Sequence, residues 1–270
     1  MEQPEGGFRD PEFPDHVWKL KKSLYGLKQS PRCWFANLHS TLREYGFTRS
    51  EYDGCIYMRK VSDAVTYVTI YVDDILLRQS WQSAEAFRTE KKYRITTDAG
   101  KLENFLGLKI NRNLGEKTIH ISQSQFIKDA LIKFGYDHCP PAKTPMDPTM
   151  DLSVNKDYQA SADDINRFRS MVGTLSWIAT CSMPEISFAV HNKKLQRATN
   201  YPEAKHFAAA GRVFKHLKGS GNKSIKLGGG TILRAYCDAN FCRDRIDGKS
   251  VTGYIVFLGD SLVAWTSRLQ

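Results

Sequence analysis

Two adjacent aspartates, Asp73 and Asp74, are the residues of this sequence best suited to metal chemistry. They interrupt a run of β-branched and aromatic residues at 65–72, which an apolar stretch at 75–77 resumes. The pattern predicts a β-hairpin with two carboxylates at its tip. Mg²⁺ prefers oxygen ligands, and two-metal phosphoryl transfer needs carboxylates on a rigid support. Taken alone, however, an Asp-Asp pair is more often simply favourable turn chemistry.

A helix is predicted upstream of this hairpin, from Ser30 to an exit at Gly46. Pro31 suits the first helical turn, and apolar residues recur every fourth position at Trp34, Leu38 and Leu42. We expect this face to pack inward, with Trp34 in the core rather than exposed as a stacking platform. The helix follows a polar segment, residues 23–32, with the sequence SLYGLKQSPR.

The basic surplus is concentrated in the second half of the chain. Lys and Arg outnumber Asp and Glu by 39 to 29, and residues 151–270 carry +7 of the net charge of +10. The stretch 193–226 holds nine basic residues and one acid. Nucleic acid is the first candidate partner, and a well-solvated surface is the alternative. The candidate nucleic-acid-binding residues recur at helix-like intervals: Lys193, Lys194, Arg197, Arg212, Lys215 and Lys218.

Prolines divide the chain. Residues 139–148 contain a Pro-Pro pair and further prolines, which exclude regular structure, so a domain boundary is predicted there. Three helices are expected over 163–218, broken at Pro184 and Pro202, followed by a glycine hinge at 228–230 and three strands. No apolar run is long enough to cross a membrane, and the N-terminus lacks the features of a signal peptide. The six cysteines form no C-x-x-C pair and are expected to be reduced.

The polar segment and the aspartate hairpin, in this order and at this spacing, resemble the polymerase motifs of copia-type LTR-retrotransposon reverse transcriptases. The tetrapeptide Tyr-Val-Asp-Asp at 71–74 and residues 23–32 are highly specific together. Further segments extend the resemblance over the chain in the family's order: 1–6, 104–110, 172–178, 184–189, 217–219, 237–240, 250–254 and 264–267.

The resemblance implies roles for the matched positions. Asp73 and Asp74 would be catalytic and bind Mg²⁺ or Mn²⁺, and Asp238 would be the first carboxylate of an RNase H site. The residues lining the incoming nucleotide and template would be Tyr25, Gly26, Lys28 and Gln29. The primer grip would be Phe105, Leu106 and Gly107. A glycine allows close backbone approach to a base pair, and a glutamine both donates and accepts hydrogen bonds.

The implied fold class is α+β. It comprises a palm-like antiparallel sheet with helices on one face, a thumb-like hairpin and helix, a helical connection and an incomplete RNase H-like sheet. The expected divisions are a partial reverse transcriptase at 1–138, a proline-rich linker at 139–162, a basic helical connection at 163–230 and the start of an RNase H domain at 231–270.

The implied function is RNA-directed DNA polymerisation. Its partners would be an RNA template, a DNA primer or RNA–DNA hybrid, dNTPs and the remainder of a polyprotein. The expected location is intracellular, either cytoplasmic in a virus-like particle or nuclear, and not secreted. The family's upstream catalytic aspartate and later RNase H acids have no match here, so we expect the chain to be inactive alone. Two alternatives stay open: a non-catalytic nucleic-acid-binding module derived from a retrotransposon, and a structural scaffold.

Overall fold

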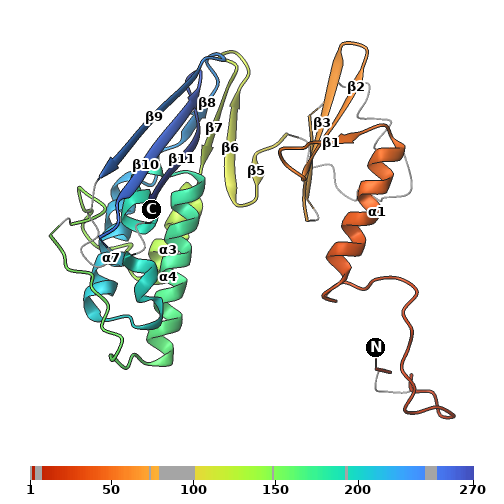
Figure 1. The fold of residues 1–270 in the computed structure, drawn as a ribbon, viewed down its shortest axis with the longest axis horizontal. Helices are drawn as coiled ribbons and strands as arrows, with labels where there is room; N and C mark the ends of the chain where they lie inside the picture. The colour runs from red at the N-terminus through yellow and green to blue at the C-terminus, as the bar shows by residue number, and fades with distance from the viewer. Residues whose placement is uncertain are drawn as a thin grey trace. The chain divides into compact units, whose positions relative to one another are not determined.

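The structure, a computed structural model, describes residues 2–3, 8–72, 74–78, 101–147, 149–191, 194–240 and 248–270. The chain forms two compact units, residues 1–98 and 99–270, and each is described by itself (Figure 1). Both contain antiparallel sheets and helices, as expected for an α+β chain. The helix expected at 83–93 lies outside the described residues, as do Asp73 and Lys193.

The first unit packs one helix against a four-stranded sheet. Helix α1 (Ser30–Glu44) precedes strands β1 (Thr48–Arg49), β2 (Ile56–Val61), β3 (Ala64–Tyr71) and β4 (Asp74–Arg78), which pair in sequence order. Because consecutive strands pair, short turns suffice to connect β2, β3 and β4. The core lies between helix and sheet and consists of Leu38, Leu42, Phe47, Tyr57, Val68 and Ile70.

The second unit begins with a sheet of strands β5 (Asn104–Phe105), β6 (Leu108–Asn113) and β7 (Thr118–Ser122). Its fourth strand, β8 (Ile225–Leu227), comes from much later in the chain and pairs with β7, placing Ile225 opposite Ile121. This long-range pairing ties the start of the unit to the segment that follows its helices.

Helices pack together beside this sheet. They are α3 (Ser124–Phe134), α4 (Ala162–Cys181) and α7 (Ala204–Ser220), with the short helices α5 (Ser187–His191) and α6 (Lys194–Arg197) and the 3₁₀ turns η1 (Pro184–Ile186) and η2 (Ala198–Asn200) between α4 and α7. Helix α3 ends at Gly135, whose φ of 79° is the left-handed value that favours glycine. One core joins α3, α4 and α7 through residues such as Ile127, Phe168 and Phe214.

Strands β9 (Leu233–Asn240), β10 (Val251–Leu258) and β11 (Ser261–Leu269) form a third sheet, with β10 in the middle. The indole Nε1 of Trp265 donates a 2.8 Å hydrogen bond to the carbonyl oxygen of Ala179. This bond connects β11 to α4. Gly228–Gly230 packs against the β10–β11 turn, where a Cβ on Gly259 would come within 2.6 Å of the Gly229 oxygen. The glycine run is therefore closely packed here, in contrast to the hinge expected from the sequence.

The proline-rich segment has a different role from the one its sequence suggests. A domain boundary was predicted there, between residues 138 and 163, but the structure keeps both flanks in one unit. Helix α3, before the segment, shares its core with α4 and α7, after it. The segment is thus a connection within a folding unit, and the division of the chain falls at residues 98–99 instead. The expected functional names of the parts, from palm to RNase H, stay predictions.

Candidate active site and nucleic-acid interfaces

The hairpin of strands β3 and β4 carries the candidate metal ligands. Tyr71 and Asp74 are register partners at the end where the two strands are connected. Asp74 is exposed at the start of β4. Asp73 lies outside the described residues. The predicted hairpin is therefore present, and its described carboxylate is accessible at the tip.

The turn has an unusual backbone at Val72. Its φ is +55°, in the left-handed region that a β-branched residue rarely adopts. Two-residue hairpin turns that match the twist of their strands need positive φ, usually supplied by glycine or asparagine. Strained backbone of this kind costs about 1–3 kcal/mol and occurs preferentially at functional sites. The Val72 side chain is 64% exposed, so burial of the side chain offsets little of that cost.

The segment before α1 forms a tight, exposed turn. Ser30 Oγ donates a 2.5 Å hydrogen bond to the carbonyl oxygen of Leu24, closing a loop around Tyr25 to Gln29. Gly26 has a φ of +93° and nothing within 4 Å of where a Cβ would stand. Tyr25, Lys28 and Gln29 are exposed. All four predicted nucleotide- and template-binding residues are thus accessible on one turn.

Trp34 connects this helix to the hairpin tip. Its indole Nε1 donates a 3.1 Å hydrogen bond to the carbonyl oxygen of Val72. The side chain is 38% exposed, so the expectation of a core tryptophan is wrong. Leu38, one helical turn later, is buried in the core, and Trp34 lies at the end of that buried stripe. The helix that begins in the first of the two most specific motifs therefore contacts the hairpin that carries the second.

Asp74 is suited to a hard divalent ion because it offers carboxylate oxygens on a braced turn. Among the described residues, no group of three or more His, Cys, Asp or Glu side chains is placed to hold a metal. The neighbouring aspartate, Asp73, falls outside that set. The donor chemistry fits Mg²⁺ or Mn²⁺, and complete coordination would draw on Asp73 or on oxygens beyond the described residues.

The predicted primer grip is a second hairpin with a strained tip. Phe105 and Leu108 are register partners, so Leu106 and Gly107 form a two-residue turn. Both have positive φ, +52° and +76°, as this turn requires. Leu106 is half-buried and Gly107 exposed. The structure therefore presents Gly107 openly, while Phe105 and Leu106 are partly covered.

Several of the predicted nucleic-acid-binding residues on α7 have internal partners. The Arg212 guanidinium donates to Thr144 Oγ1 at 2.9 Å, and Lys218 Nζ donates to the Cys139 carbonyl oxygen at 2.7 Å. Together with a backbone hydrogen bond from Ala142 to Lys215, they hold the segment 139–147 along the helix. Helical periodicity could not reveal this role, since it shows which residues share a face but not what covers that face. Binding of nucleic acid by these residues stays a prediction.

The remaining predicted site residues are dispersed. Arg197 is half-buried at the end of α6, and the side chains of Lys193 and Lys194 lie outside the described residues. Asp238 is exposed on the edge strand β9, opposite Gly253 of β10. Asp238 belongs to the second unit and Asp74 to the first.

Comparisons with known proteins establish the family. The profile of the family "Reverse transcriptase (RNA-dependent DNA polymerase)" matches residues 1–148. The putative transposon Ty5-1 protein of Saccharomyces cerevisiae is 31% identical over 99% of this chain and 86% of its own length. The chain belongs to the copia-type retrotransposon reverse transcriptases. The expectation drawn from the sequence motifs is confirmed.

Other relatives are much longer than this reverse transcriptase chain. The retrovirus-related Pol polyprotein from transposon RE1 of Arabidopsis thaliana is 33% identical over the whole chain, and that from transposon TNT 1-94 of Nicotiana tabacum is 30% identical. The chain spans only 18% and 21% of their respective lengths. No solved structure matches the reverse transcriptase chain significantly. None of its described helices has the length and apolar character needed to cross a membrane.

Proposed function

We propose that this chain forms part of the nucleotidyl-transfer centre of an RNA-directed DNA polymerase and acts within a longer Pol polyprotein. In this proposal the first unit is part of the palm, and its hairpin tip binds the divalent ion. The hydrogen bond from Trp34 to the Val72 carbonyl oxygen is the observation that supports it most, because it joins the helix that begins in the first polymerase motif to the second motif.

The chemistry assigned to each group follows from its position. The carboxylates of Asp73 and Asp74 would hold the metal ion, which supplies charge stabilisation to the phosphoryl group being transferred. The turn at Gly26 would let backbone approach the nascent base pair, since no Cβ and no neighbouring atom occupies that space. Gln29 is exposed just before α1, where its amide could bond to template or nucleotide.

The proposal includes low activity for the isolated chain. Two-metal transfer needs several carboxylates from different elements, and the hairpin contributes two neighbouring ones. The longer polyprotein relatives are consistent with the remainder of the centre coming from outside these residues. We also propose Asp238 as a carboxylate of an RNase H site.

Mn²⁺ binding to the full chain tests the metal site without requiring activity. Paramagnetic Mn²⁺ should broaden the amide NMR signals of Tyr71, Val72 and Asp74, and Asp74→Asn should weaken that broadening. Asp63→Asn is the matched control, because Asp63 is exposed in the two-residue turn of the neighbouring β2–β3 hairpin. The hairpin would lose its assigned role if both variants bound Mn²⁺ like the parent chain or if broadening centred elsewhere.

A primer-extension assay tests the second part of the proposal. With Mg²⁺ or Mn²⁺ and a homopolymer template, the 270-residue chain should extend a primer negligibly. Robust synthesis that disappears in Asp73→Asn would show instead that the chain contains a complete centre.

A further inference from the structure

Strand β9 forms an open edge of the third sheet. In the order β11–β10–β9 it pairs on one side, and all of its residues, Leu233–Asn240, are exposed (Figure 1). At the other edge of the sheet, β11 has buried residues such as Ser267 and Leu269 and is bonded to α4 through Trp265. Within the described part of the chain, the free side of β9 is therefore the uncovered edge of this sheet.

The edge is regular along its whole length. Its sequence, LRAYCDAN, contains no proline or glycine, and its register with β10 runs from Leu233 to Asn240 without a shift. Prolines, bulges and short lengths are common means by which proteins prevent an edge strand from pairing with another chain. A regular edge of eight residues is long enough to accept a further strand.

A backbone hydrogen bond shows which groups of β9 point to the free side. The Gly259 amide donates to the carbonyl oxygen of Ile232 at 2.8 Å, in the register that β9 and β10 share. Backbone groups alternate in direction along an antiparallel strand, so the even-numbered residues of β9 bond to β10. The N–H and C=O groups that point to the free side are those of the odd-numbered residues: Leu233, Ala235, Cys237 and Ala239.

This alternation restricts how a second copy of β9 can pair with the first. Only facing residues exchange backbone hydrogen bonds in an antiparallel pair, so odd-numbered residues must stand opposite odd-numbered residues. For two copies related by a two-fold axis, the axis then passes through a residue of β9 rather than between two residues. With the axis at Tyr236, Leu233 stands opposite Ala239 of the second copy, and the pairing uses nearly the whole strand.

The axis at Tyr236 also brings opposite charges together. Arg234 stands opposite Asp238 of the second copy, and the symmetry produces this pair twice. At such positions, which exchange no backbone hydrogen bonds, facing Cα atoms are only about 4.5 Å apart. Opposite charges there are favourable and like charges unfavourable. An axis at Ala235 or Cys237 would separate these charges, so the charges select Tyr236.

Both charged side chains are accessible to a second copy. Asp238 is exposed and has no ion-pair partner among the described residues. The Arg234 side chain is 49% exposed, although its guanidinium donates to the Gly259 oxygen at 2.7 Å and lies 3.6 Å from the Asp260 carboxylate. Because arginine has five N–H donors, it can bind a further carboxylate and keep these contacts.

We propose that two copies of this chain pair antiparallel through β9, with a two-fold axis at Tyr236. The product is a continuous sheet with the two β9 strands at its centre, where the exposed Tyr236 side chains face each other. The inference uses the edge of β9 alone and does not rest on the proposed polymerase function. Within the dimer Asp238 is ion-paired, so dimerisation and the RNase H role proposed for Asp238 exclude each other.

Sedimentation velocity of the nuclease-treated full chain tests the proposal. The parent chain should show a concentration-dependent equilibrium between monomer and dimer. Arg234→Asp and Asp238→Arg each create two like-charge contacts and should weaken dimerisation about tenfold or more. An equimolar mixture of the two variants should form a heterodimer, because every facing pair then has opposite charges again. The double variant Arg234→Asp/Asp238→Arg should dimerise like the parent chain for the same reason.

The matched control makes the same charge reversal at the other edge of the sheet. Arg268 is exposed on β11, so Arg268→Asp should leave dimerisation unchanged. A parent chain that stays monomeric at every concentration would overturn the proposal, as would a dimer that survives both reversals on β9. Loss of the dimer in both single variants without recovery in their mixture would also overturn it, because damage to the fold would then explain the loss.

Mild oxidation tests the register of the two strands. Tyr236→Cys/Cys237→Ala should form a disulfide between two copies through position 236, because facing residues at the axis are within reach of such a bond. Leu233→Cys/Cys237→Ala should not link through position 233, which faces position 239. Mass spectrometry of the tryptic peptides identifies the link. Linkage through position 233 and not through position 236 would overturn the axis at Tyr236.

Discussion

The indole Nε1 of Trp34 lies 3.1 Å from the carbonyl oxygen of Val72 and donates a hydrogen bond to it. This bond joins the first turns of α1 to the tip of the β3–β4 hairpin. Val72 has a backbone conformation that valine disfavours, so a donor that fixes its carbonyl helps to hold the turn.

Replacing Trp34 by phenylalanine keeps a ring and removes the N–H donor. We expect a loss of about 0.5–1 kcal/mol in the free energy of unfolding, the lower part of the range for one hydrogen bond, because the site is partly exposed. Hydrogen exchange of the β3 and β4 amides should accelerate. Trp177→Phe is the control, since Trp177 is similarly exposed at 40%. Equal effects on β3 and β4 exchange in the two variants would contradict a bracing role for Trp34.

Val72→Gly should be far less destabilising than glycine substitutions in strands usually are. Relief of the left-handed backbone gains about 1–2 kcal/mol, and the extra chain entropy of glycine costs about 0.5–1 kcal/mol. Val65→Gly, at an exposed position of β3, should instead cost about 1 kcal/mol. Urea denaturation of both variants measures the difference. A loss at Val72 as large as at Val65 would show that the turn is not strained.

Stability should depend on pH through His206. Burial lowers the pKa of this histidine below its usual 6.5, although hydrogen bonding to the Leu152 backbone and the charge of Glu203 act in the opposite direction. As the pH falls, His206 therefore becomes protonated in the unfolded chain before it does so in the folded chain. Stability contributed by neutral His206 is present above about pH 6.5 and is lost as the pH falls below it, by at most about 1.4 kcal/mol per pH unit.

Replacing His206 by glutamine removes the titrating group but keeps a side chain that can cap the start of α7. His206 Nδ1 accepts a 3.0 Å hydrogen bond from the Glu203 amide at the start of α7, and Gln can accept the same bond. His206→Gln should thus flatten the decline of unfolding free energy between about pH 7 and pH 5. His138→Gln, at a side chain that is 96% exposed, should not. An unaltered decline in His206→Gln would assign the pH dependence to other groups.

Arg212→Gln should loosen the proline-rich segment. Without the hydrogen bond from the Arg212 guanidinium to Thr144, residues 139–147 lose one of the hydrogen bonds that hold them against α7. We expect faster trypsin cleavage after the exposed Lys143 than in the parent chain, while Lys156→Gln leaves that rate unchanged. Unchanged cleavage in Arg212→Gln would leave Arg212 available for the nucleic-acid role predicted from the sequence.

The local elements followed from local patterns. The β-branched run before Asp73 predicted β3, and Pro31 with the four-residue apolar spacing predicted α1, because both signals depend on neighbours a few residues apart. The family also followed from sequence, since residues 23–32 and 71–74 are short, contiguous motifs.

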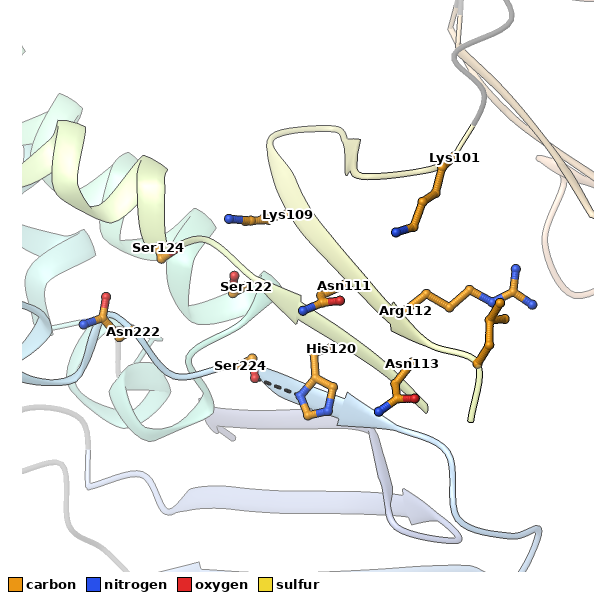
Figure 2. A pocket seen from close by; sticks show the side chains of 11 residues that line it. Lys101, Lys109, Asn111, Arg112, Asn113, His120, Ser122, Ser124, Asn222 and Ser224 are labelled. Carbon is orange, nitrogen blue, oxygen red and sulfur yellow. Dashed lines mark hydrogen bonds between the residues drawn. The ribbon is translucent and has the colours of Figure 1, made fainter. Parts of the chain in front are cut away.

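Long-range relationships were decided only by the tertiary structure. Sequence periodicity could not show that Trp34 reaches Val72, that β8 pairs with β7 or that Arg212 faces the proline-rich segment. A polar pocket likewise combines side chains from β6, β7 and the loop at 222–224, which no local pattern connects (Figure 2). The physical reason is that each of these contacts joins segments that are far apart in sequence. Packing of the whole unit brings such segments together, and the residues next to each of them in the sequence do not indicate which partner it will meet.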